Sequence, residues 1–209
     1  MKILRLFTLA AVVAGVMALP AGAQVEFEVT PFAGGTFYLA DLPNQFSLHR
    51  GSASDLIVHD GKFGDAWTLG LNAGFRIREA WALEGMFAWL PTNLSATSGL
   101  TGVEDLNAYM YGLTGLYYLP VDWRIQPFVG LGAGAETYAY NRSGLEGHTD
   151  LMGNVVGGLY ASVTDMVGLR LEARDCFARF ESGVQSVDNA WENDLMVTLG
   201  LSFRTRLGG

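Results

Sequence analysis

The three histidines are the residues of this sequence best suited to acid–base chemistry. Beside a carboxylate and a hydroxyl group or a water molecule, a histidine can activate a nucleophile that hydrolyses a peptide or a lipid ester. His59 is followed by Asp60, and His148 lies two residues before Asp150, whereas His49 stands apart. The spacing assembles no catalytic set around them, so we predict solvated loop histidines and no catalytic residue. An envelope enzyme that modifies lipids or cuts proteins is the alternative, and it requires a histidine within hydrogen-bond reach of a serine or a carboxylate.

Other potential functional residues have simpler explanations. The run Gly130–Gly134 resembles part of a dinucleotide-binding loop, but no helical pattern follows it, so no cofactor is predicted. Cys176 is the only cysteine and is expected to be a small buried residue rather than a nucleophile. Acidic residues gather in the same segments as the histidines and could hold divalent cations that bridge to lipopolysaccharide, but the sequence assigns no metal ligands.

A second group of charged residues lies in segments whose other residues are mostly apolar or small. The members are Arg76, Glu84, Glu136, Arg170, Glu172 and Arg174. Arginine forks that face carboxylates form strong hydrogen bonds when both are enclosed. We therefore predict that these six side chains form a polar network inside the fold, with Glu28, Arg124 and Arg204 as further candidates. A gated ion path along the same residues is an alternative use of the network.

The segments that carry these charges alternate between apolar and polar or small residues. In the segment 67–77, every odd position is apolar and every even position is Thr, Gly, Asn or Arg. A period of two places the two sets on opposite faces of a β-strand. The same pattern predicts eight strands, over residues 27–37, 67–77, 81–89, 106–119, 123–136, 151–163, 167–174 and 194–204.

Two features complicate the pattern. Both faces of the segment 106–119 are apolar, and the shared phase with Asn107 predicts that Tyr109, Tyr111 and Tyr117 face inward. Pro31 and Pro127 stand within predicted strands, although proline lacks the backbone donor that a strand needs. Each proline is therefore expected at a strand start or at a bulge.

The composition indicates export into a membrane. Two basic residues, an apolar stretch over 6–19 and the triplet Ala21–Ala23 have the layout of a signal peptide, which predicts a signal over 1–23 and one barrel domain over 24–209. Half of the residues are hydrophobic, yet no second apolar stretch is long enough for a helical span. A closed barrel is the other way to satisfy the backbone inside a membrane. The net charge of −8 argues against a nucleic-acid partner.

The connections between the predicted strands alternate strictly in length. Short connections fall at 78–80, 120–122 and 165–166, and longer ones at 38–65, 91–105, 141–150 and 177–192. Outer-membrane barrels have short periplasmic turns and longer external loops. The sequence thus predicts an all-β fold, an eight-stranded antiparallel up-and-down transmembrane barrel with both termini in the periplasm and an acidic loop face outside. A soluble barrel or sandwich, with the apolar set inside, is the alternative.

The same layout predicts an aromatic girdle at each end of the barrel. Trp81, Tyr118, Trp123 and Phe203, with Phe27 and Phe75, are expected at the short-turn end, and Trp67, Trp89, Trp191 and Phe37 at the long-loop end. With eight strands the interior is about wide enough to be filled by side chains, so a plugged lumen is expected rather than an open pore.

Three stretches carry a family resemblance. The segments 111–120, 123–134 and 169–175 are similar to those of the small OmpA/OmpX-like outer-membrane β-barrel family. The resemblance implies a barrel inserted by the outer-membrane assembly machinery, which recognises a terminal aromatic residue, here Phe203 with six residues after it. OmpA-like proteins proper also carry a peptidoglycan-binding domain, but this sequence stops at Gly209, so we expect no such domain and no tethering to the cell wall. We expect a non-enzymatic monomer with a structural or surface-interaction role, in contact with outer-membrane lipid and lipopolysaccharide.

Overall fold

The structure, a computed structural model, describes eight stretches of the chain. These are residues 25–39, 45–48, 56–77, 80–96, 104–121, 124–141, 147–180 and 190–207. The predicted signal peptide and Trp123 lie outside them, as does the side chain of Trp191. Within the described residues, no helix has both the length and the apolar character that a membrane span needs.

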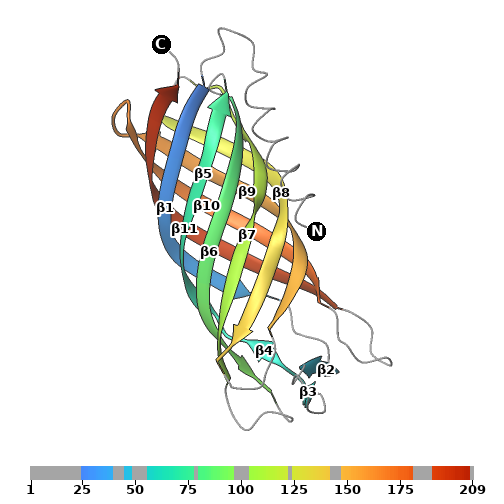
Figure 1. The fold of residues 1–209 in the computed structure, drawn as a ribbon. Coiled ribbons are helices and arrows are strands. Elements are labelled where there is room, and N and C mark those ends of the chain that lie inside the picture. The colour runs from blue at the N-terminus through green and yellow to red at the C-terminus, as the bar shows by residue number, and fades with distance from the viewer. Residues whose placement is uncertain are drawn as a thin grey trace, which may run out of the picture.

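Eight long antiparallel strands close into a barrel, as the alternation predicted (Figure 1). They are β1 (Val25–Tyr38), β5 (Ala66–Ile77), β6 (Trp81–Ser95), β7 (Glu104–Tyr118), β8 (Ile125–Tyr140), β9 (His148–Ser162), β10 (Val167–Phe180) and β11 (Ala190–Leu207). Strands adjacent in the chain pair with each other, and β1 pairs with β11 to complete the circle. Three short strands precede β5: β2 (Gln45–Leu48) and β3 (Leu56–His59) form a hairpin, and β4 (Lys62–Phe63) pairs with the end of β6.

The two ends of the barrel differ in their connections. β1 starts and β11 ends at the end that carries the short turns, whereas β2, β3 and β4 lie at the opposite end (Figure 1). We call these the turn end and the loop end. The predicted strands β6, β10 and β11 are longer in the structure, and all three extend at the loop end. Strand pairing therefore continues past the apolar alternation from which the boundaries were predicted.

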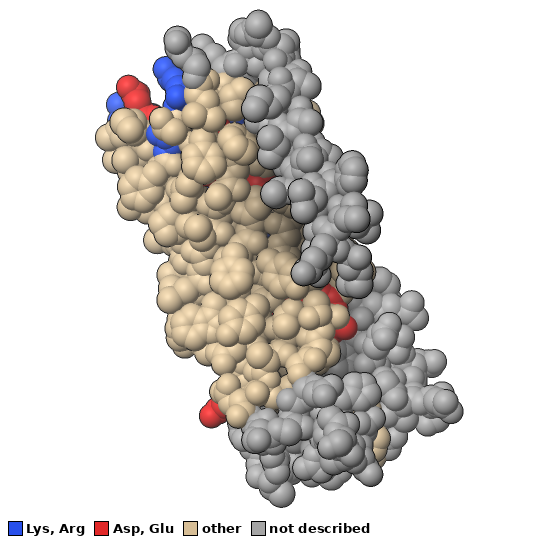
Figure 2. Space-filling model, in the orientation of Figure 1, with Lys and Arg blue, Asp and Glu red and all other residues tan. Residues whose placement is uncertain are grey.

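The outward face of the barrel is apolar. Leucine side chains such as Leu131 and Leu199 are 69% and 58% exposed, and most of the visible face between the two ends is uncharged (Figure 2). The polar phase of the strands points inward and is buried. A soluble barrel would have the opposite arrangement, with its apolar set in the interior.

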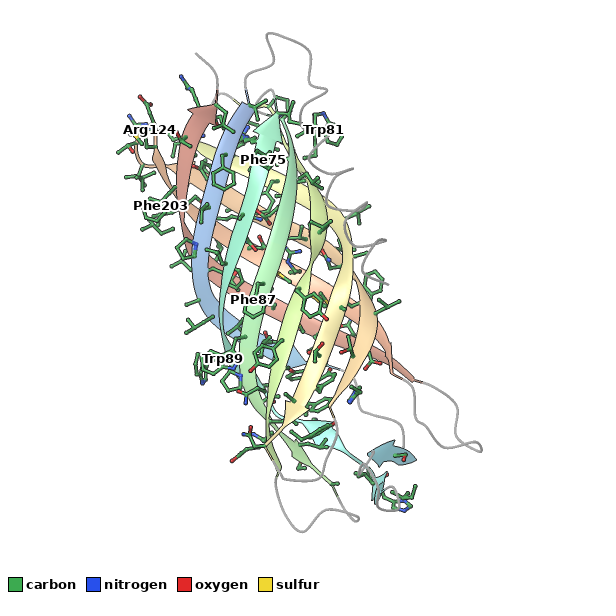
Figure 3. All side chains as sticks on the ribbon, viewed as in Figure 1. Phe75, Trp81, Phe87, Trp89, Arg124 and Phe203 are labelled. Carbon is green, nitrogen blue, oxygen red and sulfur yellow. The ribbon has the colours of Figure 1, made fainter. Side chains whose placement is uncertain are left out.

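Aromatic side chains gather at both ends of this apolar face, as Figure 3 shows for Phe75, Trp81 and Phe203 at the turn end and Trp89 toward the loop end. Trp67 packs edge-on against Trp89, with ring centroids 5.0 Å apart. Tyr118, however, does not belong to the turn-end girdle, because it is 1% exposed inside the barrel.

The prediction for the tyrosines of β7 was also wrong. Tyr111 is 42% exposed on the outer face, and Tyr117 packs against the exposed Trp81 with ring centroids 4.7 Å apart. Asn107 misled the assignment because it lies near the loop end, where it accepts a hydrogen bond from Trp89 Nε1 at 2.8 Å. An outward polar residue at that level carries no information about which phase faces inward.

The two prolines are accommodated without a bulge. Around Pro31 the register between β1 and β11 is the same on both sides, from Val29↔Phe203 to Phe32↔Gly200. Only the ladder at residues 30 and 31 is interrupted, and there the hydroxyls of Thr30 and Ser202 hydrogen-bond at 2.7 Å. The bulge expected at Pro31 is therefore replaced by a side-chain hydrogen bond. Pro127 lies in register near the start of β8, as expected.

Candidate functional site: the barrel interior

The centre of the barrel holds a compact ionic network built on two arginines. Arg170 is 1% exposed, and both of its terminal nitrogens donate to the carboxylate of Glu84, with Nη2 to Oε1 at 3.0 Å. Nη2 also donates to Glu172. Glu84 projects from β6 and Arg170 from β10, so these bonds cross the lumen between strands that are not neighbours in the sheet.

The second arginine extends the network toward the loop end. Arg174 Nε donates to Glu172 Oε1 at 2.9 Å, and Nη1 donates to Thr114 Oγ1 and Asn154 Oδ1, each at 2.8 Å. Thr114 is on β7 and Asn154 on β9, and both are 1% exposed. The network thus connects β6, β7, β9 and β10 across the full width of the barrel.

Small residues make room for this packing. A Cβ atom at Gly158 would lie 2.4 Å from Cζ of Phe128, whose ring supports the guanidinium of Arg170 at 4.6 Å. Two guanidinium groups face the carboxylates of Glu84 and Glu172, and Glu28 lies 4.0 Å from Arg170. Enclosed arginine–carboxylate hydrogen bonds of this kind fix the side chains in place within their layer of the lumen.

The other two predicted network residues lie at different levels. Arg76 is 4% exposed and near the turn end, where it donates to Gln126 and stacks 3.8 Å above the ring of Tyr118. Glu136 is 1% exposed nearer the loop end, close to the buried carboxyl group of Asp194. The six residues therefore occupy three layers of the interior, and only Glu84, Arg170, Glu172 and Arg174 form one cluster.

Most of the side chains that fill the loop-end half of the interior, apart from Glu136 and Asp194, are apolar, which the sequence did not predict. Phe63, on β4, folds into the mouth and stacks on Tyr138 with ring centroids 4.8 Å apart and planes within 1°. Tyr38 approaches the same ring of Phe63 at 5.3 Å. Beneath this aromatic plug the core is rich in methionine, from Met86, Met110, Met152 and Met196. The aromatic plug and the ionic network are two separate layers of packed side chains, and the plug lies nearer the loop end.

One histidine–carboxylate pair, His148 with Asp150, remains a candidate for acid–base catalysis. His148 Nε2 lies 3.3 Å from Asp150 Oδ2, and its ring stacks on Tyr138 at 4.8 Å. The pair meets the minimum requirement of the enzyme alternative, which was a histidine in reach of a carboxylate. His49 lies outside the described residues, and among those described no group of three or more His, Cys, Asp or Glu side chains could hold a metal ion.

The two remaining candidates for the interior lie at the rim of the turn end. Arg124 is exposed there (Figure 3), rather than enclosed in the lumen, and Arg204 is 18% exposed and paired with Glu26 at 3.7 Å. Both follow the inward phase, but the strands end at this level, so the side chains reach water. The alternation alone could not distinguish a residue in the middle of a strand from a residue at its end.

Comparison with known proteins agrees with this architecture. A family model described as an outer membrane protein beta-barrel domain matches residues 7–203. Curated protein sequences give no match. Among solved structures, Neisserial surface protein A aligns with a TM-score of 0.58 at 13% identity, over 88% of this chain and 99% of that one.

Two further structures have the same fold at similarly low identity. Outer membrane protein AlkL, determined in DMPC lipid bilayers, aligns with a TM-score of 0.57 at 15% identity, over 92% of this chain and 96% of that one. OprG from Pseudomonas aeruginosa aligns with a TM-score of 0.52 at 14% identity, over 86% and 95%. These likenesses concern the fold alone. Because the family model matches nearly the whole sequence, the chain belongs to the outer membrane protein β-barrel domain family and is a protein of the outer membrane.

Proposed function

We propose that this protein is a non-enzymatic, monomeric barrel whose lumen is closed and whose long loops face the cell exterior. The observation that carries the proposal is the pair of seals in series: the plug of Phe63 and Tyr138, and the network of Arg170 and Arg174. A barrel sealed twice is a rigid support for its loops. Its role is then structural, or one of contact with other surfaces, with outer-membrane lipid and lipopolysaccharide around it.

The proposed orientation places both termini and the short turns in the periplasm. It is supported by the difference between the turn end and the loop end, since barrels of this family carry their longer connections outside. The outer-membrane assembly machinery would then meet Phe203 at the periplasmic end.

Cysteine labelling on intact cells tests the orientation. Leu39→Cys, in the first loop-end connection, is expected to react with a membrane-impermeant maleimide on intact cells, because Leu39 is 62% exposed. Pro120→Cys, in an exposed short turn, is expected to react only after the outer membrane is permeabilised. The native Cys176 is 2% exposed and serves as the silent background. Labelling of Pro120→Cys before permeabilisation would reverse the proposed orientation.

Permeability measurements test the closed lumen. We expect proteoliposomes with the wild-type barrel to show no stable conductance steps and to swell in small sugars no faster than empty liposomes. The double variant Phe63→Ala/Tyr138→Ala is expected to behave in the same way, because the ionic network still blocks the lumen below the plug. An open porin in parallel vesicles is the positive control. Steady conductance of the wild-type protein would contradict the proposal and favour the gated ion path.

An envelope enzyme is the second candidate, because His148 and Asp150 are paired at the loop end. A histidine–carboxylate pair needs a third group, a hydroxyl or a bound water, to hydrolyse an ester or a peptide. A lipid-deacylating or proteolytic activity of the purified barrel that disappears in His148→Ala and Asp150→Asn would establish this candidate over the first.

A further inference from the structure

An apolar groove crosses the lipid-facing surface at the turn end. Its cavity is about 670 Å³, and its walls are Phe27 and Val29 of β1, Phe203 of β11, and Met166 and Val167 where β10 begins. Met166 is 63% exposed and Phe203 is 47% exposed. The turn of residues 163–166, held by a hydrogen bond from Arg204 N to Met166 O at 2.9 Å, forms one side. The groove therefore has the chemistry of a site for a hydrocarbon chain.

A polar pocket of about 210 Å³ opens inside the rim at the same end. Four arginines line it, together with a single carboxylate among the described residues: Arg76, Arg124, Arg204, Arg206 and Glu26. Arg204 and Arg206 both pair with Glu26, the latter from Nε at 3.1 Å. Even with Arg76 set aside, the described lining holds three guanidinium groups and one carboxylate, so it carries more positive than negative charge, which favours an anion.

Arg204 belongs to the lining of both the groove and the pocket. Its guanidinium is held in place by Nε donating to Asp165 O at 2.9 Å and by Nη2 donating to Ser162 Oγ at 3.3 Å. The ring of Tyr160 lies 5.4 Å from Cζ on one side. A fixed guanidinium binds an anion at a lower entropic cost than a free side chain does. The apolar and cationic parts thus meet at one preorganised residue.

We propose that this rim binds a glycerophospholipid, with the phosphate among Arg124, Arg204 and Arg206 and an acyl chain in the groove of Phe27 and Met166. Arginine forks match phosphate oxygens, and basic pockets at the edge of membrane proteins bind lipid headgroups. Charge complementarity selects an anion, and the adjoining groove selects an anion that carries a hydrocarbon chain. The inference rests on the proposed orientation in one respect, because the periplasmic leaflet is the one that supplies glycerophospholipids.

Binding of three probes to the purified full-length barrel in neutral detergent, followed by native mass spectrometry, tests the proposal. The probes are phosphatidylglycerol, diacylglycerol with the same chains, and glycerophosphoglycerol, which has no chains. We expect phosphatidylglycerol to bind about tenfold or more tightly than either of the others, since each of these lacks half of the recognised structure.

Matched variants locate the site. Arg124→Gln/Arg206→Gln is expected to weaken phosphatidylglycerol binding about tenfold, to the level of diacylglycerol, whereas Lys62→Gln, a neutralised charge at the loop end, changes nothing. Met166→Ser is expected to weaken binding severalfold, while Leu151→Ser, an exposed apolar residue near the loop end, is silent.

The outcomes are distinguishable. Equal binding of phosphatidylglycerol and diacylglycerol, unaffected by the arginine variant, would overturn the proposal in favour of unspecific annular lipid. If glycerophosphoglycerol bound as tightly as phosphatidylglycerol, the proposal would be overturned in favour of a site for a soluble anion without acyl chains. Neither result depends on orientation, since the detergent complex has none, so a failure of the labelling experiment overturns only the leaflet and leaves the binding site to be judged on these probes.

Discussion

Replacing Arg170 by leucine is expected to lower the free energy of unfolding of the barrel by about 3–5 kcal/mol. Arg170 is 1% exposed and donates to both Glu84 and Glu172. The substitution leaves these two carboxylates to share Arg174, which reaches Glu172 Oε1 at 2.7 Å but Glu84 Oε1 only at 3.6 Å. A buried carboxylate that has lost its partner has neither water nor an opposite charge to stabilise it.

Reversible unfolding in urea, with the barrel in lipid vesicles and folding followed by heat-dependent gel mobility, measures the change. Two controls separate the cause from the mere loss of an arginine. Arg206→Leu removes an arginine whose side chain is 72% exposed, and is expected to change the free energy by less than about 1 kcal/mol. Arg170→Leu/Glu84→Leu removes both partners and is expected to be more stable than Arg170→Leu alone. If the double variant were the less stable, uncompensated charge would not be the reason for the loss.

The barrel could be predicted because its outer face must be continuously apolar. In β5 from Trp67 to Ile77, and in β10 from Val167 to Arg174, every outward residue is apolar and every inward residue is glycine, polar or charged, so the phase is unambiguous. In β7 this logic failed, because the inward residues Leu106, Met110 and Leu116 are themselves buried apolar residues of the interior. Alternation identifies an inward face only where that face is polar.

For the candidate site, the sequence could predict which charged residues lie in the interior but not how they pair. Charges that interrupt an apolar or small-residue segment, as Glu84 and Arg174 do, have no stable location but the interior, and this is where they lie. The pairing between them could not be predicted, since it depends on the stagger of strands that do not neighbour each other. Phe63 was missed for another reason. It stands in a long connection without alternation, and its place in the mouth follows from the pairing of β4 with the extension of β6.

The two halves of the interior are therefore stabilised by different kinds of interaction. The turn-end half and the centre are held by directional bonds of Arg76, Arg170 and Arg174, which fix the distances between opposite strands. The loop-end half is packed with methionine and aromatic side chains, which adapt to the shape that the strands impose. The adaptable apolar half therefore lies nearest the loop end, and the ionic layers beneath it link opposite strands by directional bonds.

The variant Leu199→Arg is expected to have a free energy of unfolding about 2–4 kcal/mol lower than that of the wild-type barrel, which is the cost of a guanidinium near the middle of a bilayer. Leu199 is 58% exposed on the outer face of β11, about halfway between the two ends of that strand. A guanidinium at this depth must lose its hydration or draw water into the hydrocarbon layer. The same urea titration in lipid vesicles measures the effect.

Leu207→Arg is the matched control, because it makes the same change on the same strand. Leu207 is 45% exposed and is the last residue of β11, at the turn end, where a guanidinium reaches the headgroups. The expected cost there falls to about 0–1 kcal/mol, so the difference between the two variants reports depth rather than the loss of a leucine. Equal costs at the two positions would mean that the apolar face does not span the hydrocarbon layer between them. A cost confined to position 199 would place the centre of the bilayer at the level of the outward leucines, around the same layer in which Arg170 and Glu84 are enclosed.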